Sequence, residues 1–533
     1  MKKNKMLLSI LFAFLLIVIP SKALALTNLT QEDFDEVNEE KGITYHEEEG
    51  YSGYLVLEDG EYVLDEDIEL NAYISVESEN DVTIDLNGKS IASANESPFA
   101  FGVAGKLTLT GKGTVGKKLE VLSPEEDDDV VMIVYHGEVT IEDAVFNGVI
   151  QNFVGDLTIN NGTFNDNITV QNAKLTINNG TFNGISLANS VDVEINGGKF
   201  YTNVRDLGFG ININEEVEEE PTEEEIDVLS ANPAIVYRHN EFYGGPGDDN
   251  NEPVGSIVIN DGEFNGSASS IYLWDIKDAT INGGTFNSHL YSAVVKAENI
   301  KIAGGLFKVT EDALFKKYAH EPLRTSVALI SKNIELSGGK YVNDTDGHTI
   351  TIDRLNNEDT EESFEDILKE GYIYSDEISV KHYGDEEGED LYNSNSMWYL
   401  ENQEILVIPE EGEYEILDGA DQEVKSGSNL IVRASGDISL FVKLLIDDKE
   451  VDRDNYELTE GSTIVTLNSS FLANLSSGKH TMTFVYKNGE VKTSFTINNE
   501  KNPATGDNVL LYVGLLGLSV ISLLGYKLVR RAN

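Results

Sequence analysis

The sequence predicts an all-β protein, in which an array of short stacked coils is followed by a small, separate β module. One strand motif recurs between Asp156 and Phe200, in the segments GDLTINNGTFND, AKLTINNGTFNG and VDVEINGGKFYT. Its apolar pairs return every 18 residues, as Leu157/Ile159, Leu175/Ile177 and Val193/Ile195. Evenly spaced strand patterns bounded by turn residues then occupy 435–497.

The first 25 residues have the order of a secretory signal peptide. Three lysines precede an apolar run from Met6 to Ile19, and Ala23-Leu24-Ala25 forms a cleavage site of the A-x-A type. A first transmembrane helix is the alternative, but the run is shorter than the roughly 20 residues that span a bilayer. We therefore expect export and cleavage after Ala25, which leaves an acidic N-terminal segment over 26–50.

The 18-residue repeat is too short for a strand, a helix and their turns, but it suits three short strands around a narrow core. Because side chains alternate along a strand, Leu and Ile of L-T-I-N point inward and Thr points outward. The following N-G or G-G tolerates the positive φ that lets the chain turn a corner. A phenylalanine comes next in each copy, and we expect these rings to stack as an internal ladder: Phe164, Phe182, Phe200, Phe264, Phe286 and Phe307.

Looser copies of the repeat extend from D-V-T-I-D-L-N-G at 81–88 to Leu336. This pattern resembles the right-handed parallel β-helix of the pectin-lyase-like superfamily, including uncharacterised surface proteins of Firmicutes. The resemblance covers about 51–355 and implies a fold but no particular activity. A β-sandwich with regular turns is the competing fold, although sandwich strands do not repeat a whole motif at constant spacing. We expect the aligned Asn160, Asn178 and Asn196 to form a hydrogen-bonded ladder rather than a ligand site.

Three insertions interrupt the repeats, at 117–129, 206–233 and 308–324, and a further loop spans 240–254. Each insertion lies between the phenylalanine strand and an apolar strand, so all three are expected on one side of the array. Insertions on one face of a repeat protein are often its binding face. Aromatic residues near these loops suit a sugar-binding platform, although alternation should turn half of them into the core: Tyr237, His239, Phe242, Tyr243, Tyr272 and Trp274.

Enzymes that cleave polysaccharides on such a scaffold need clustered carboxylates and a basic residue. The nearest match is N-D-T-D-G-H at 343–348, which resembles the N-T-D and G-H elements of polygalacturonases but compresses them into one terminal turn. We therefore expect no catalytic residues, no metal centre and no cofactor. Weak calcium binding stays open for the short acidic segments at 247–252, 344–347 and 385–390, none of which completes an EF-hand loop.

The segment over 356–425 is expected to be a helical cap, with its helix at 362–372, followed by an acidic linker. A module over 426–498 comes next, with an N-G hairpin signal at 486–491. Its D-N-Y, S-T-I-V-T-L, F-L-A-N-L and S-G-K-H-T-M-T-F series resembles the Ig-like modules of cellulosomal scaffoldins. That resemblance implies a small β-sandwich serving as a stalk, with a glycan role in some relatives, and it assigns no binding residue.

The last segment, 499–533, combines a pentapeptide, an apolar stretch at 509–524 and a basic tail. The pentapeptide consists of Asn502, Pro503, Ala504, Thr505 and Gly506. The order resembles the LPXTG-like sorting signal of Gram-positive surface proteins, in which a sortase cleaves between Thr and Gly and joins Thr to peptidoglycan. Asn502 replaces the usual Leu, so the sortase class stays undefined. A C-terminal transmembrane anchor is the alternative.

Charge and composition limit the possible partners. The chain has 94 acidic and 38 basic residues, a net charge of −56, which argues against nucleic acid. Its lack of cysteine excludes disulfides and thiol catalysis. We expect a secreted protein, covalently anchored to the cell wall, that displays a binding or adhesion module for a glycan or host protein. A polysaccharide lyase or glycoside hydrolase is the first alternative, and a purely structural surface element is the second.

Overall fold

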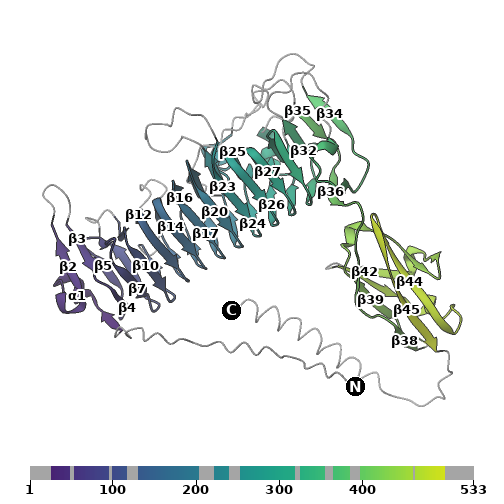
Figure 1. Ribbon diagram of the computed structural model, residues 1–533, viewed down its shortest axis with the longest axis horizontal. Coiled ribbons are helices and arrows are strands. Elements are labelled where there is room, and N and C mark those ends of the chain that lie inside the picture. The colour runs from purple at the N-terminus through teal and green to yellow at the C-terminus, as the bar shows by residue number, and fades with distance from the viewer. Residues whose placement is uncertain are drawn as a thin grey trace, which may run out of the picture. The chain divides into compact units, whose positions relative to one another are not determined.

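The computed structural model describes residues 26–47, 53–94, 99–116, 130–202, 221–238, 253–318, 324–353, 364–383, 397–425, 427–459 and 462–498. Within these residues the chain is all-β, as predicted, and it divides into two compact units, Met1–Glu410 and Glu411–Asn533. Figure 1 shows the strands of the first unit in a regular series, from β2 and β3 at one end to β34 and β35 at the other.

The 18-residue repeats are built from short strands, three in one copy and two in the copy before it, where a single strand at Val149–Ile159 occupies the first two positions. One repeat consists of β16 (Ile168–Gln171), β17 (Lys174–Ile177) and β18 (Thr181–Asn183). Each strand pairs in parallel, without a register shift, with its counterpart in the next repeat: β19 (Ile185–Ala188), β20 (Asp192–Ile195) and β21 (Lys199–Tyr201). A repeat therefore satisfies its backbone through its neighbours rather than within itself.

The strands of the first unit form a larger sheet of 23 described strands and a smaller one of 13. Besides the strands already given, the larger sheet contains β1 (Thr27–Leu29), β2 (Ile43–His46), β3 (Tyr54–Leu57), β4 (Gly60–Leu64), β6 (Ile74–Val76), β7 (Asp81–Asp85), β9 (Phe101–Val103), β10 (Lys106–Thr110), β12 (Val130–Ile141), β14 (Val149–Ile159), β22 (Ile235–Arg238), β23 (Val254–Ile259), β25 (Ser269–Ile281), β27 (Tyr291–Ile302), β29 (Thr325–Ile330), β30 (Asn333–Leu336), β32 (His348–Asp353), β34 (Val380–Tyr383) and β35 (Met397–Leu400). The smaller sheet adds β5 (Ile68–Leu70), β8 (Ser90–Ser93), β11 (Thr114–Val115), β13 (Val145–Phe146), β15 (Thr163–Phe164), β24 (Glu263–Asn265), β26 (Thr285–Ser288), β28 (Leu306–Val309), β31 (Lys340–Asn343), β33 (Tyr372–Tyr374) and β36 (Glu404–Pro409). The helical segments of this unit are α1 (Gln31–Asp35), η1 (Glu39–Lys41), α2 (Glu223–Ser230), α3 (Ala313–Tyr318) and η3 (Phe364–Ile367).

The repeated apolar pairs build the core of this unit. Ile177 pairs in register with Ile159 on one side and Ile195 on the other, and all three are fully buried. Thr176, the neighbour of Ile177, is only half-buried because successive side chains of a strand point to opposite faces. The predicted inward and outward assignment is therefore confirmed.

The predicted aromatic ladder is also confirmed. From Phe164 to Phe307, successive rings stack with centroids 4.6–4.9 Å apart. Phe146 extends the ladder at one end, and Tyr341 extends it at the other. Every ring is at most 1% exposed, so the ladder is a continuous apolar column that no single repeat could bury alone.

The acidic segment at 26–50 is not separate from the array, which corrects the expected boundary. In its described part, β1 pairs in parallel with β4, and β2 pairs antiparallel with β3. Leu29, Phe34 and Ile43 are buried in the core of the first unit. These three apolar side chains extend the core to the start of the first unit although the surrounding composition is strongly acidic.

The end of the first unit also differs from the expected helical cap. Of the helix expected over 362–372, the described part forms only the 3-10 turn η3, and β33 begins at Tyr372. The Lys369 amide donates to the Leu336 carbonyl, and Gly371 adopts a φ of 82°, so the backbone leaves a helical path. Strands β35 and β36 then pair antiparallel with β32 and β31, so this part belongs to the array rather than to a linker.

The second unit consists of two sheets and begins before the expected residue 426. Its sheets have the strand orders β37-β39-β43-β42 and β38-β45-β44-β40-β41. The early strands β37 and β38 pair with β39 and β45, and they therefore belong to this module. The predicted hairpin is present, since Tyr486 of β44 pairs with Gly489 of β45. The elements are β37 (Ile416–Asp418), β38 (Gln422–Lys425), β39 (Leu430–Ala434), η4 (Ile438–Leu440), β40 (Phe441–Ile446), β41 (Lys449–Glu450), η5 (Arg453–Asn455), β42 (Tyr456–Thr459), β43 (Thr463–Leu467), α4 (Ser469–Leu472), β44 (Gly478–Tyr486) and β45 (Gly489–Asn498).

Candidate functional site

Two of the predicted insertions contribute helices to one region of the first unit. Helix α2 belongs to the insertion at 206–233, and α3 belongs to the one at 308–324. The two helices contact each other, and Leu229 of α2 and Phe315 of α3 join a buried cluster with Val294 of β27 and Ala328 of β29. This cluster is separate from the internal core, so the helices cover part of the outer surface of the larger sheet.

Tyr272 and Trp274 of β25 lie at the border of this helix-covered region. Both are half-buried and pack against the cluster under α2 and α3, whereas Leu273 between them is fully buried in the internal core. Their rings stack in parallel with centroids 5.5 Å apart. Because side chains alternate along a strand, both rings lie on the outer face of the larger sheet. We expected exposed aromatic residues near the insertions, and these two rings lie there.

Charged groups accompany Trp274. The Lys296 ammonium lies 4.5 Å from the centroid of the Trp274 ring, close enough for a cation–π interaction. The same ammonium forms a 2.8 Å ion pair with Asp275. Asp275 adopts a φ of 63° where the pairing of β25 with β27 shifts register, and its carboxylate contacts the same ammonium as the Trp274 ring. An aromatic ring, an ammonium and a carboxylate therefore share one partly exposed surface.

Tyr237 is not part of that surface. Its side chain is fully buried, and its hydroxyl, which has one hydrogen to donate, lies 2.9 Å from the Asn189 carbonyl oxygen and 3.1 Å from the Val254 carbonyl oxygen. Burial raises the pKa of Tyr237, with a smaller contribution from Asp275. Tyr237 pairs with Leu273, an inward position, and is therefore a core residue rather than a candidate ligand contact. The candidates His239, Phe242 and Tyr243 lie outside the described residues.

The N-D-T-D-G-H string at 343–348 builds a turn. The Asn343 side chain donates to the carbonyls of Arg324 and His348, and it accepts hydrogen bonds from the amide and hydroxyl of Thr345. Asp344 pairs with Lys308 at 2.8 Å. These polar side chains are used in shaping the backbone, as an Asx turn does.

His348, at the end of that turn, packs against another aromatic ring and is not placed for proton transfer. Its ring stacks on Tyr399 with centroids 3.7 Å apart, and burial lowers the pKa of His348 to about 4. Its Nδ1 atom is buried and has no hydrogen-bond partner within the described part of the chain. The ring is therefore neutral at neutral pH and stabilises the contact between β32 and β35.

The aligned asparagines form the predicted ladder. Asn178 donates to Asn160 at 2.7 Å, and Asn196 donates to Asn178 at 2.9 Å. The ladder continues through Asn260 and Asn282 with the same amide-to-carbonyl geometry. Each amide is used by its neighbours, which confirms the structural interpretation of these residues.

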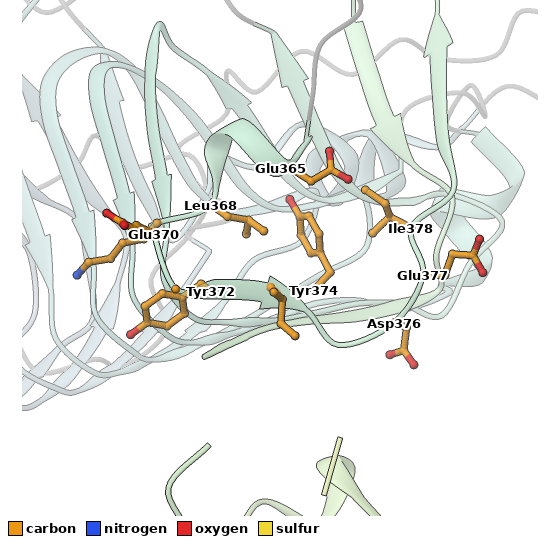
Figure 2. Close-up of a pocket in the computed structure, with 11 residues that line it drawn as sticks. Glu365, Leu368, Glu370, Tyr372, Tyr374, Asp376, Glu377 and Ile378 are labelled. Carbon is orange, nitrogen blue, oxygen red and sulfur yellow. The ribbon is translucent and has the colours of Figure 1, made fainter. Parts of the chain in front are cut away.

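A groove near the end of the first unit was not expected from the sequence. It has a volume of about 600 Å³ and lies between η3, β33 and the residues that follow β33. In Figure 2, the Tyr374 ring stands between Leu368 and Ile378, with Glu370 on one side and Asp376 and Glu377 on the other. Its lining residues are Glu365, Leu368, Lys369, Glu370, Gly371, Tyr372, Ile373, Tyr374, Asp376, Glu377 and Ile378.

Tyr374 fixes one wall of the groove. Its hydroxyl donates to the Phe364 carbonyl at 2.9 Å, and burial raises the pKa of Tyr374. This bond ties β33 to η3 and holds the ring in place. The sequence contains a strand pattern at this groove, Tyr372-Ile373-Tyr374 directly after Gly371. We did not recognise it because we expected a helix over 362–372.

Several expected features cannot be located in the structure. The sorting pentapeptide Asn502–Gly506, the signal peptide and the acidic segments at 247–252 and 385–390 lie outside the described residues. Among the described residues, no group of three His, Cys, Asp or Glu side chains is placed to hold a metal ion. The helices in this part of the chain are all too short or too polar to cross a membrane.

No protein-family model and no curated protein matches the chain.

Proposed function

We propose that the chain is a secreted protein, covalently anchored to a Gram-positive cell wall, that displays a binding module on a stalk. The observation that carries the proposal is the order NPATG, apolar stretch and basic tail at 502–533, together with the signal-peptide pattern at 1–25. A sortase would cleave after Thr505 and join it to peptidoglycan. Both signals act on the same exported chain, since one directs secretion and the other retention.

The display module in this proposal is a right-handed parallel β-helix. Support comes from the three-strand repeat, from parallel pairing of each strand with its counterpart in the next repeat, and from the internal phenylalanine ladder. The stalk is an Ig-like β-sandwich. Support comes from its two separate sheets and from the hairpin between β44 and β45. An array held by in-register pairing is rigid and suits the presentation of a surface at a distance from the wall.

The binding role is supported by two surfaces of the first unit: the partly exposed Trp274 surface and the groove beside β33. The Trp274 ring offers a face for the C–H groups of a sugar, and Asp275 and Lys296 offer hydrogen-bonding groups beside it. A glycan or a host protein is therefore the proposed ligand. For the lyase or hydrolase alternative, the nearest sequence match lends no support within the described residues, because Asn343 and Thr345 are used in a turn.

A glycan-array screen of residues 26–498 tests the binding role. We expect a defined set of glycans to bind, and Trp274→Ala to weaken that binding at least tenfold. Tyr135→Ala is the matched control, since Tyr135 is an exposed aromatic residue of the same sheet at a distant repeat. Equal loss in both variants, or sustained turnover of polyuronides in a parallel assay, would contradict the proposal.

A further inference from the structure

The groove beside β33 combines a hollow with the edge of a sheet. Strand β33 is the terminal strand of its sheet, and within the described residues it pairs only with β36. A terminal strand presents backbone N–H and C=O groups that another extended chain can pair with. The groove residues Tyr372, Ile373 and Tyr374 are the whole of this strand, so the hollow lies along the terminal strand of the sheet, where the Tyr372 amide already donates to the Lys369 carbonyl.

The groove is strongly acidic at its rim. Glu365, Glu370, Asp376 and Glu377 are exposed lining residues, and Lys369 is the one basic residue among them. Among the described lining residues, four carboxylates outnumber one ammonium, which favours a negative potential in a concave site, where charges act more strongly than on a flat surface. The complementary ligand is therefore cationic.

The floor and walls of the groove are apolar and aromatic. Leu368, Tyr372, Tyr374 and Ile378 are half-buried, and Ile373 is 37% exposed. Aromatic faces next to carboxylates suit the methylene stem and charged head of Lys or Arg, since the stem packs on the ring and the head reaches the acids. A simple metal ion would use none of this apolar surface.

We propose that this groove binds a basic peptide segment in an extended conformation. The segment adds as a strand to β33, and its Lys or Arg side chains cross the tyrosine rings to reach Glu370 and Asp376. Alternate side chains of an added strand point to the same face, which gives the groove a preference for basic residues at every second position. This inference names a ligand class for the binding role proposed above, and it rests on that role.

Fluorescence anisotropy with residues 26–498 tests the proposal. The probe is a labelled decapeptide of alternating Lys and Thr at 0.15 M salt. The comparison ligands are the same peptide with backbone N-methyl groups on one edge, an alternating Glu and Thr peptide, and spermine. We expect saturable binding of the Lys peptide, at least tenfold weaker binding of the N-methylated peptide, and no binding of the acidic peptide.

Variants distinguish the groove from the general negative charge of the chain. Glu370→Lys combined with Asp376→Lys should weaken binding of the Lys peptide at least tenfold. Glu194→Lys combined with Asp192→Lys is the matched control, because these exposed carboxylates lie on β20 of the same unit. The control should change affinity less than twofold, and circular dichroism should verify folding of both double variants.

Three outcomes would overturn the inference: no saturable binding, equal losses in the groove and control variants, or equal binding of the N-methylated peptide or spermine. Retained glycan binding with absent peptide binding would remove this inference alone. A mature protein without a wall linkage would instead remove the proposed anchoring and leave the groove's affinity unaffected.

Discussion

Truncation of Ile177 tests the core of the array most sharply. The side chain is fully buried, and register partners Ile159 and Ile195 lie on both sides of it. Ile177→Ala removes three carbon groups, worth about 2.4 kcal/mol at about 0.8 kcal/mol each. The neighbouring repeats hold their own positions and cannot collapse into the gap, so a cavity term is added. We expect a total cost of about 3–5 kcal/mol.

Tryptophan fluorescence during urea unfolding of residues 26–498 provides the assay. The chain has two tryptophans, Trp274 and Trp398, and both belong to the first unit. The signal therefore reports on the array without a contribution from the second unit. A shift of the midpoint at unchanged slope measures the loss of stability.

The matched control is Thr176→Ala on the same strand. Thr176 is half-buried and faces away from the core, so its truncation should change stability by less than about 0.5 kcal/mol. Equal midpoint shifts for the two variants would refute the inward and outward assignment. A large loss of slope for Ile177→Ala would show instead that the array unfolds in parts.

The other predictions concern the amide ladder and two histidines. Asn178→Ala breaks the hydrogen bonds to Asn160 and Asn196 and should cost about 1 kcal/mol in the same urea assay; no change would mean that water replaces the ladder. Burial opposes protonation of His480, but hydrogen bonds from its ring to the Ser476 carbonyl and the Asp447 carboxylate outweigh burial and raise its pKa. The second unit should therefore keep this stabilisation below about pH 6.5 and lose it as pH rises through the raised pKa, as measured by hydrogen exchange in β44 after correction for intrinsic rates. The same pH dependence in His480→Gln would contradict this cause. His348 has its pKa lowered to about 4, so its contribution to the first unit should be complete above about pH 6.5 and decline toward pH 4 in urea unfolding; a flat profile would contradict the burial of a neutral ring.

The repeats were predictable because their signals are local and periodic. Leu175, Ile177 and Phe182 recur at one spacing, and each recurrence places the same side chain in the same environment. The ends of the array carry no such repetition. Strand β33 pairs with β36 across the segment that contains β34 and β35, so nothing near Tyr372 in the sequence indicates its partner. The groove depends on that distant pairing, and the helix expected at 362–372 also hid the local strand pattern at Tyr372–Tyr374.

The aromatic candidates illustrate a second limit of the sequence. Alternation shows which residues of one strand share a face. To compare Tyr237 with Trp274, which lie on different strands, the pairing register between those strands must also be known. Tyr237 pairs with Leu273, whereas Trp274 pairs with Arg238, so one aromatic residue enters the core and the other stays at the surface. The loop at 240–254 lies between the two strands and interrupts the regular spacing, so their relative register could not be read from the sequence.

Mass spectrometry of the mature protein, released from walls by a muramidase, tests the anchoring proposal most directly. We predict a C-terminal peptide that ends at Thr505 and carries a peptidoglycan fragment on its carboxyl group, with no peptide from residues 506–533. The unlinked variant Thr505→Ala should be recovered from the membrane or the medium rather than from the wall. Peptides covering 509–524 in the mature wild-type protein would contradict sortase anchoring.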